Sequence, residues 1–278
     1  MYRITLSFMA LLLMAGCNRA DKVQSTGMDE KVIMAQALQL RADSIGRATA
    51  FDNDFASVVR IMVVDTDGNV VVSSQREDYS SLGLTTNNDR FLFEPGRLLF
   101  PLLMSTITDL DTTIQLPVGT VNFGGYYLSD SRRILDTSTG YFFDSLPVMK
   151  ALAEGSNVAM AAFGKMFFYE NRDDMLQKIS KILPNAIVSE TTDDASFYRF
   201  CIGHGLKTNM SSLLMCYLRN DVLSLLPENG LSALYRINSR VINLFIKRYG
   251  DYVGLIIVDD CRTSGRMAQD ALDIVFEL

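Results

Sequence analysis

Few side chains in this sequence are spaced for nucleophilic catalysis. A serine followed three residues later by a lysine places both groups on one side of a helix, where the amine can handle the proton of the attacking hydroxyl. No serine in the 278-residue sequence has a lysine at that spacing. The single histidine, His204, stands between two glycines, and no carboxylate partner for its imidazole is evident from the sequence. Packing of His204 at a turn is therefore preferred over a catalytic role.

Cysteine and histidine usage gives no pattern for a metal or cofactor site. Beyond Cys17, the cysteines are Cys201, Cys216 and Cys261, an odd number in apolar contexts. Such thiols are typical of buried, unpaired side chains rather than of a disulfide framework or a metal cluster. With His204 as the single histidine, zinc ligation would need improbable partners. We expect no metal and no cofactor.

The first sixteen residues are typical of a secretory signal peptide, with one cation at Arg3, an apolar run and two small residues. The run is shorter than the ~20 apolar residues needed to span a bilayer. Residues 13–17 resemble a bacterial lipobox, in which the cysteine becomes the N-terminus and carries acyl chains. We therefore expect residues 1–16 to be a lipoprotein signal peptide and Cys17 to be the lipid attachment site. An ordinary signal peptide that contains a cysteine is the alternative.

The remaining chain predicts a tether followed by one domain. Residues 17–27 are mostly polar and predict the tether, and residues 28–278 are long enough for a single large domain. The net charge of −6 argues against a nucleic-acid surface. If Cys17 is acylated, the protein is a secreted lipoprotein, anchored to a membrane and facing the periplasm or the cell exterior.

The order of elements predicts an α+β fold. Residues 57–74 contain two β-branched strands around an Asp-Gly turn, which is a hairpin signal. Residues 252–260 form a continuous apolar strand, and residues 267–278 predict a closing helix. Residues 94–219 predict mainly helices. We expect a three-layer sandwich, in which a central, mainly antiparallel sheet joins the early hairpin to the late strand and a helical subdomain is inserted between them.

Two further segments predict helices. Residues 28–51 have apolar residues at helical spacing, including Val32, Ile33 and Leu40, and predict an amphipathic helix. Residues 220–251 also predict mostly helix.

Five segments of the sequence resemble the transpeptidase domain of class B penicillin-binding proteins, and they occur in the order of that family. They are the hairpin at 58–74, the run into the active-site helix at 87–101, the helix with a Ser-x-Asn motif at 145–160, the Ile-Gly-Tyr-Gly segment at 200–221, and the last strand and helix at 252–278. Five unrelated segments would have to fall in this order by chance. The resemblance implies a penicillin-binding transpeptidase-like fold.

The resemblance also shows which catalytic groups are missing. In the family, a serine at the start of the active-site helix attacks an amide carbonyl, and a lysine one turn later handles the proton. In this sequence those two positions hold Arg97 and Phe100. Arginine stays protonated and has no lone pair for attack, and phenylalanine moves no proton. We therefore expect no catalytic residues. Arg97 would instead pair with an acidic side chain, bind a carboxylate ligand or be solvated.

The other two family motifs are also altered. The Ser-x-Asn position holds Gly155, Ser156 and Asn157, and Ser156 is expected to point away from the cleft. Asn157 would hold a neighbouring loop or keep a role in ligand binding. The family's Lys-Thr-Gly motif is not found, and we expect its edge strand to have been deleted. The predicted vestigial cleft consists of Arg97, Gly155, Ser156 and Asn157.

The sequence therefore predicts a pseudoenzyme of the serine D,D-transpeptidase class, acting in the cell envelope by binding peptidoglycan or cell-wall synthesis proteins. One alternative is an active penicillin-binding acyltransferase with a substitute nucleophile, for instance Ser156, Ser105 or Ser131. Another is an unrelated ligand-binding lipoprotein, in which residues 58–74 would not pair with residues 252–259. The aromatic stretch at 125–145 would be either an exposed recognition loop or part of the core.

Overall fold

A computed structural model of the chain describes residues 30–52, 58–77, 87–189, 191–237, 240–259 and 266–277. The predicted signal peptide, the predicted tether, Cys17 and Cys261 lie outside these residues. Within them, no helix is both long enough and apolar enough to cross a membrane.

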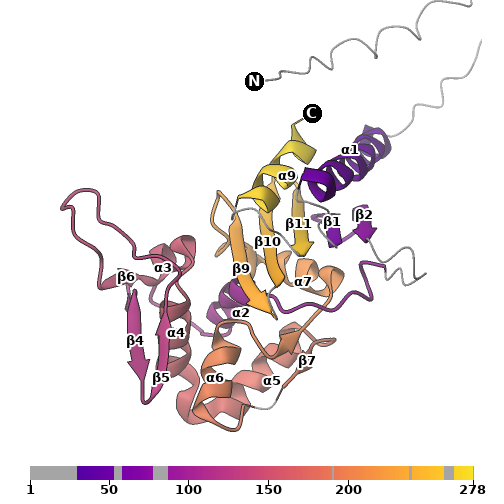
Figure 1. Ribbon diagram of the computed structural model, residues 1–278. Coiled ribbons are helices and arrows are strands. Elements are labelled where there is room, and N and C mark those ends of the chain that lie inside the picture. The colour runs from indigo at the N-terminus through magenta and orange to yellow at the C-terminus, as the bar shows by residue number, and fades with distance from the viewer. Residues whose placement is uncertain are drawn as a thin grey trace, which may run out of the picture.

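A five-stranded antiparallel sheet has the strand order β2-β1-β11-β10-β9 (Figure 1). Its strands are β1 (Val58–Asp65), β2 (Val70–Glu77), β9 (Leu231–Ile237), β10 (Arg240–Tyr249) and β11 (Tyr252–Asp259). The early hairpin therefore pairs with the late strand, as predicted, with Val58 opposite Asp259 and Asp65 opposite Tyr252. This pairing removes the alternative in which residues 58–74 and 252–259 lie apart.

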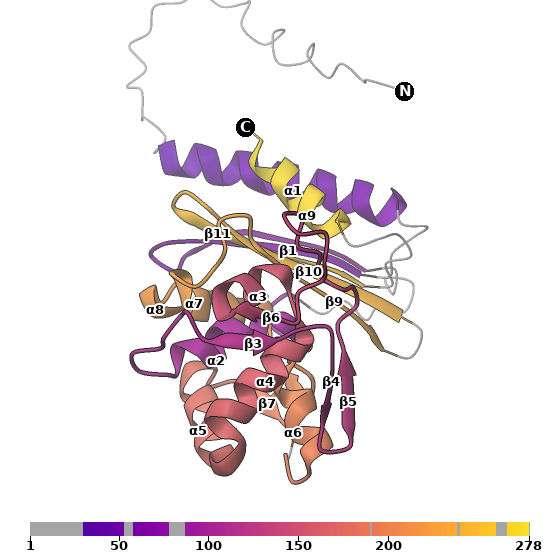
Figure 2. The ribbon, with the colours of Figure 1, turned by 90° about the vertical axis from the view of Figure 1, so that its left-hand side faces the viewer.

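Both faces of the central strands are covered, so neither face of β1 is exposed to solvent. Ile61 and Val63 point into a core beneath two helices, α1 (Glu30–Asp52) and α9 (Met267–Phe276), whereas Met62 and Val64 point into the core of the helical body. Figure 2 shows these two layers on opposite sides of the sheet. The continuous β-branched runs follow from burial on both faces, and the predicted three-layer arrangement is confirmed.

The helical body lies between β2 and β9 in the sequence. Its helical elements are η2 (Gly96–Leu99), α2 (Phe100–Ser105), α3 (Val148–Glu154), α4 (Asn157–Phe168), η3 (Tyr169–Asn171), α5 (Arg172–Ile182), α6 (Asp194–Cys201), α7 (Met210–Tyr217) and α8 (Asn220–Leu223). Three two-stranded sheets accompany them: β3 (Gln115–Pro117) with β6 (Ser145–Pro147), β4 (Thr120–Phe123) with β5 (Tyr126–Ser129), and β7 (Ile187–Val188) with β8 (Leu206–Lys207).

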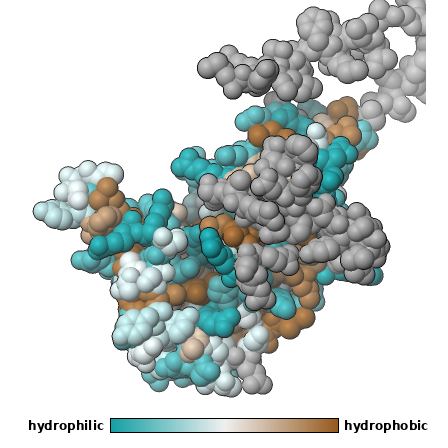
Figure 3. Space-filling model, viewed as in Figure 1, coloured by the Kyte–Doolittle hydropathy of each residue, from teal (hydrophilic) through white to brown (hydrophobic). Residues whose placement is uncertain are grey.

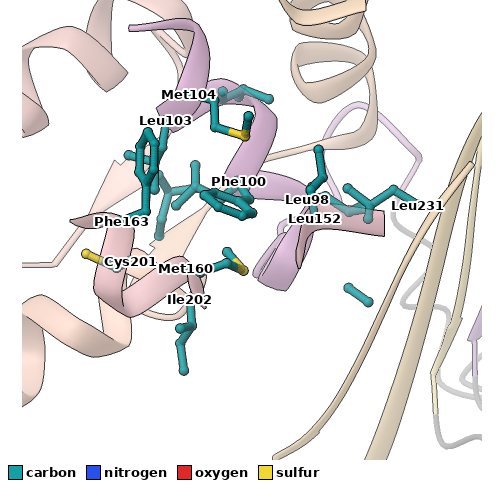
Figure 4. Packing of buried hydrophobic residues seen from close by; sticks show 14 of the residues in the cluster. Leu98, Phe100, Leu103, Met104, Leu152, Met160, Phe163, Cys201, Ile202 and Leu231 are labelled. Atoms are coloured by element: carbon teal, nitrogen blue, oxygen red, sulfur yellow. The ribbon is translucent and has the colours of Figure 1, made fainter. Parts of the chain in front are cut away.

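Helix α2 runs through the centre of this body. Phe100 is 1% exposed and meets Phe163 of α4 edge to face, with 5.3 Å between the ring centroids. Figure 4 shows the Phe100 ring between Leu103 and Met160. Phe100, which the sequence resemblance aligns with the family's lysine, is therefore a core residue.

Two helix predictions need correction. The described residues of 220–251 contain one four-residue helix, α8, and all of β9 and β10, because strand pairing of β10 with β11 and of β9 with β10 outweighs local helix propensity. The edge strand predicted to be deleted is therefore present as β9. Helix α1 forms as predicted, but Val32, Ile33 and Leu40 are exposed and its buried face consists mainly of small residues that allow close approach to the sheet.

Replacing Phe100 tests its role in the core. Phe100→Ala should lower the free energy of unfolding by about 3–5 kcal/mol, because it leaves a cavity under the sheet. Tyr127→Ala is the control, since Tyr127 is 73% exposed and its loss should change stability by less than about 0.5 kcal/mol. Denaturant unfolding followed by circular dichroism measures both. Equal stabilities for the two variants would contradict the assignment.

Candidate functional site

The predicted vestigial cleft lies where the start of η2, the turn between α3 and α4, and the edge strand β9 meet. Gly96 has a positive φ of 54°, and a Cβ there would lie 3.2 Å from Ala233 and from Tyr235 on β9. A Cβ on Gly203 would lie 1.9 Å from the Gly96 carbonyl oxygen. The Gly96 amide donates to the Gly203 carbonyl at 3.2 Å. Two glycines therefore fix the start of the helix against the strand and the α6–β8 turn.

Arg97 fills the space between η2 and the α3–α4 turn. Its Nη1 donates to the carbonyl oxygen of Gly155. Gly155 ends α3 in the left-handed region with φ 68°, and a Cβ there would lie 1.8 Å from Nη1. The guanidinium group therefore rests directly on Gly155, where another residue would displace it. Burial lowers the pKa of Arg97 and the charge of Asp130 opposes that effect, but an arginine remains charged at neutral pH.

Ser156 turns inward and is part of a closed polar network. Its Oγ accepts a hydrogen bond from the Ala159 amide at 3.0 Å and donates to Asp130 Oδ2 at 2.8 Å. Asp130 also accepts from the amides of Gly119 at 2.8 Å and Val158 at 3.0 Å. Its carboxylate stabilises the N-terminus of α4 and ties the β4–β5 hairpin to that helix.

Sequence reasoning did not find Asp130. It lies 26 residues from Ser156, and nothing local marks it as a partner of that serine. Asn157 is partly buried at the start of α4, and its side chain makes no hydrogen bond within the described part of the chain.

The lone histidine has a carboxylate partner, which corrects the expectation from sequence. His204 Nδ1 lies 2.8 Å from Glu94 Oε2, and the Gly205 amide donates to Glu94 Oε1 at 3.0 Å. The Tyr235 hydroxyl donates to the Glu94 carbonyl at 2.6 Å, and its ring meets the His204 imidazole edge to face. Glu94 and His204 are 110 residues apart in sequence, so only the fold reveals the pair.

Glu94 is held ionised by these contacts. Burial by itself raises the pKa of Glu94, but the hydrogen bonds from His204 and Gly205 outweigh it and hold the pKa below its usual value. The pair borders a hollow of about 360 Å³ that also includes Ser189, Arg199 and Gly205.

Strand β9 occupies the cleft edge but carries no lysine. Its sequence is LSALYRI, in which Leu231 and Ala233 are buried and Arg236 is exposed. The strand of the third family motif is therefore retained, although its Lys-Thr-Gly is absent from it.

Of the other candidate nucleophiles, Ser105 is hydrogen-bonded, Cys201 and Cys216 are buried, and Ser131 is exposed. Ser105 Oγ donates to the Leu102 carbonyl at 2.9 Å, as expected for a serine in the last turn of a helix. Burial raises the pKa of Cys216 to about 12 and raises the pKa of Cys201 further, so neither thiol supplies a thiolate at neutral pH. Among the described residues, no group of three His, Cys, Asp or Glu side chains is arranged to hold a metal ion.

Comparison with known proteins identifies the fold. No protein-family model matches the sequence, and no curated protein matches it. Solved structures do match. A peptidoglycan glycosyltransferase from Burkholderia ambifaria has a TM-score of 0.66 and 14% identity, over 86% of this chain and 93% of that one.

Two penicillin-binding proteins give similar values. The apo TP domain of penicillin-binding protein 3 from Burkholderia pseudomallei has a TM-score of 0.63 and 14% identity, over 87% of this chain and 91% of that one. Penicillin-binding protein 3 from Mycobacterium tuberculosis, complexed with aztreonam, has a TM-score of 0.64 and 14% identity, over 86% of this chain and 77% of that one. The chain has a penicillin-binding-protein transpeptidase-like fold, as the sequence resemblance predicted.

A double-mutant cycle tests the contact between Arg97 and Gly155. Gly155→Ala should lower the free energy of unfolding by about 2 kcal/mol or more, because it imposes a left-handed conformation on alanine and displaces the Arg97 guanidinium. In the Arg97→Ala background the clash is absent, so the same substitution should cost less by at least about 0.5 kcal/mol. Chemical denaturation of the wild type, the two single variants and the double variant gives the coupling energy between Arg97 and Gly155. If the effects of the two substitutions on the free energy of unfolding simply add, the contact is contradicted.

Acid unfolding tests the Glu94–His204 pair. Folding lowers the pKa of Glu94, so the ionised carboxylate adds to the free energy of unfolding. This contribution is fully present above the pKa of an unfolded carboxyl group, about 4.3, and is lost as the pH falls through the lower pKa of Glu94 in the folded chain. Glu94→Gln should therefore cost about 1–3 kcal/mol at pH 7, and this difference should shrink on acidification. Glu154→Gln, which removes an exposed partner of Arg132, should cost less than about 1 kcal/mol. If Glu94→Gln lowers the free energy of unfolding by the same amount at every pH, protonation of Glu94 is not coupled to folding.

Proposed function

We propose that this domain is a pseudoenzyme of the serine transpeptidase class, which acts in the cell envelope without acyl transfer. The observation that carries the proposal is Arg97, which the sequence resemblance aligns with the family's nucleophile and which rests on Gly155. Phe100, at the lysine position, lies in the core beside Phe163. Removing nucleophile and base together leaves an enzyme with binding contributions only.

The proposed role is binding. A transpeptidase-like fold that keeps its cleft elements but lacks their chemistry suits recognition of peptidoglycan or of cell-wall synthesis proteins. The lipobox-like sequence at Cys17 supports a lipid anchor, which would hold the domain at a membrane surface facing the periplasm or the cell exterior. Absence of binding to purified peptidoglycan, together with no envelope partner in crosslinking, would count against this role.

A substitute nucleophile is the alternative. Ser156 is the candidate nearest the cleft, but its hydroxyl donates to Asp130 and accepts from the Ala159 amide. No lysine follows Ser156, Ser105 or Ser131 at a spacing of three. None of these serines therefore has the neighbouring base that activates a hydroxyl.

Intact-mass spectrometry distinguishes the two. The mature chain with Cys17→Ser, incubated with a penicillin and with a thioester mimic of a cell-wall substrate, should show no acyl adduct. An active penicillin-binding protein treated in parallel is the positive control, and circular dichroism checks that the chain is folded. A stable adduct would overturn the pseudoenzyme proposal, and peptide mapping would then identify the nucleophile.

A further inference from the structure

Residues 130–144, here called the arm, project from the body as an ordered loop. The segment folds back on itself through a bridge between Leu135 and Phe142, and the Asp136 amide donates to the Tyr141 carbonyl at 2.8 Å. The Asp136 carboxylate fixes the tip, since it accepts hydrogen bonds from the Ser138 amide at 3.0 Å and the Ser138 hydroxyl at 2.6 Å. Figure 1 shows the arm standing away from the helical body.

The arm exposes apolar side chains although its backbone is fixed. Leu135 is 48% exposed, Tyr141 77% and Phe142 45%. The guanidinium of Arg133 lies 4.4 Å above the Phe142 ring, and within the described structure it makes no ion pair. In Figure 3 the arm is the lobe at the left, where brown and pale side chains meet. A preorganised aromatic surface beside an arginine is the composition of an interaction hot spot.

A hollow with complementary chemistry lies elsewhere on the molecule. It has a volume of about 450 Å³ and lies between the first turns of α1 and the β1–β2 and β10–β11 turns. Val32, Ala35 and Val70 supply apolar walls, and the exposed carboxylates of Asp67 and Asp251 lie at its edge. Neither carboxylate makes a hydrogen bond or ion pair with the described residues.

The other charged groups of the hollow leave it acidic. Asp65 also lines it, but its carboxylate already accepts hydrogen bonds from the amides of Asp67 and Asn69. Lys31 contributes one positive charge against the three carboxylates.

We infer that the arm of one copy docks in this hollow on a second copy of the chain. The exposed rings of Tyr141 and Phe142 match its apolar walls, and Arg133 meets its free carboxylates. Figures 1 and 2 place the arm away from the first turns of α1, so one copy does not fill its own hollow. The arm contains 15 residues, 130–144, whereas each partner contributes about 20–30 residues to a standard protein–protein interface. The interface is therefore small, and we expect association to be weak and to depend on protein concentration.

Sedimentation velocity on the mature chain with Cys17→Ser tests this association. The average mass should rise with protein concentration, and Tyr141→Ala should weaken association about tenfold or more. Tyr127→Ala is the matched control, because Tyr127 is equally exposed, at 73%, but lies on β5 outside the arm. A wild-type chain that stays monomeric, or a Tyr141→Ala variant that associates normally, would overturn the inference.

Charge reversal tests whether the hollow is the docking site. Arg133→Glu alone should be monomeric, and so should a chain carrying Asp67→Lys and Asp251→Lys. A mixture of the two should associate, because the unchanged arm of the second variant fits the unchanged hollow of the first, and the reversed arm of the first matches the reversed hollow of the second. No association in the mixture would show that the arm and the hollow do not meet. Binding of a monomeric wild-type chain to phosphatidylglycerol vesicles, lost in Tyr141→Ala, would assign the arm to a lipid surface instead.

Discussion

The pairing of β1 with β11 is the constraint on which the rest of the structure depends. These strands come from opposite ends of the domain sequence, and their side chains are buried on both faces. A shift of register by one residue would exchange every side chain between the two cores. The pairing therefore needs helices on both sides of the sheet, and β10 and β9 continue it toward the helical body. As a result, the start of η2 is held against the edge strand, which is where the family's catalytic serine would stand.

The residues that the sequence resemblance aligns with the family's catalytic groups are part of the packing at this position. Phe100 fills the core under the sheet, and Arg97 closes the gap to the α3–α4 turn by resting on Gly155. The Ser156–Asp130 network then fixes the first turn of α4. Restoring a serine and a lysine would remove these contacts, and the lysine would be a buried charge. The proposed loss of acyl transfer and the stability of the fold would therefore be coupled through these positions.

The sequence predicted those strands whose residue pattern can be recognised within the segment itself. The hairpin predicted at 58–74 and the strand predicted at 252–260 have β-branched or continuous apolar patterns, and they form as β1 with β2 and, over Tyr252–Asp259, as β11. Strand β9 was missed because residues 220–251 have no strong alternation, and its pairing with β10 and contact with Gly96 form only in the fold.

Contacts distant in sequence were missed for the same reason. Glu94 and His204 are 110 residues apart, and no sequence pattern around either residue predicts their contact. The exposure of Leu40 was also unexpected, since an apolar residue at helical spacing predicts burial, but α1 approaches the sheet through small residues such as Ala42. The assignment of Arg97, Gly155, Ser156 and Asn157 to a vestigial cleft stays a prediction from the sequence, and the contacts of Arg97 and Ser156 became visible only in the fold.

A crystal structure of the mature chain with Cys17→Ser, soaked with a penicillin, would show whether Arg97 closes the cleft. We expect the Arg97 guanidinium to lie on the Gly155 carbonyl, with no density joining the penicillin to any side chain. An open cleft, with Arg97 turned away and the penicillin bonded to a serine, would contradict it.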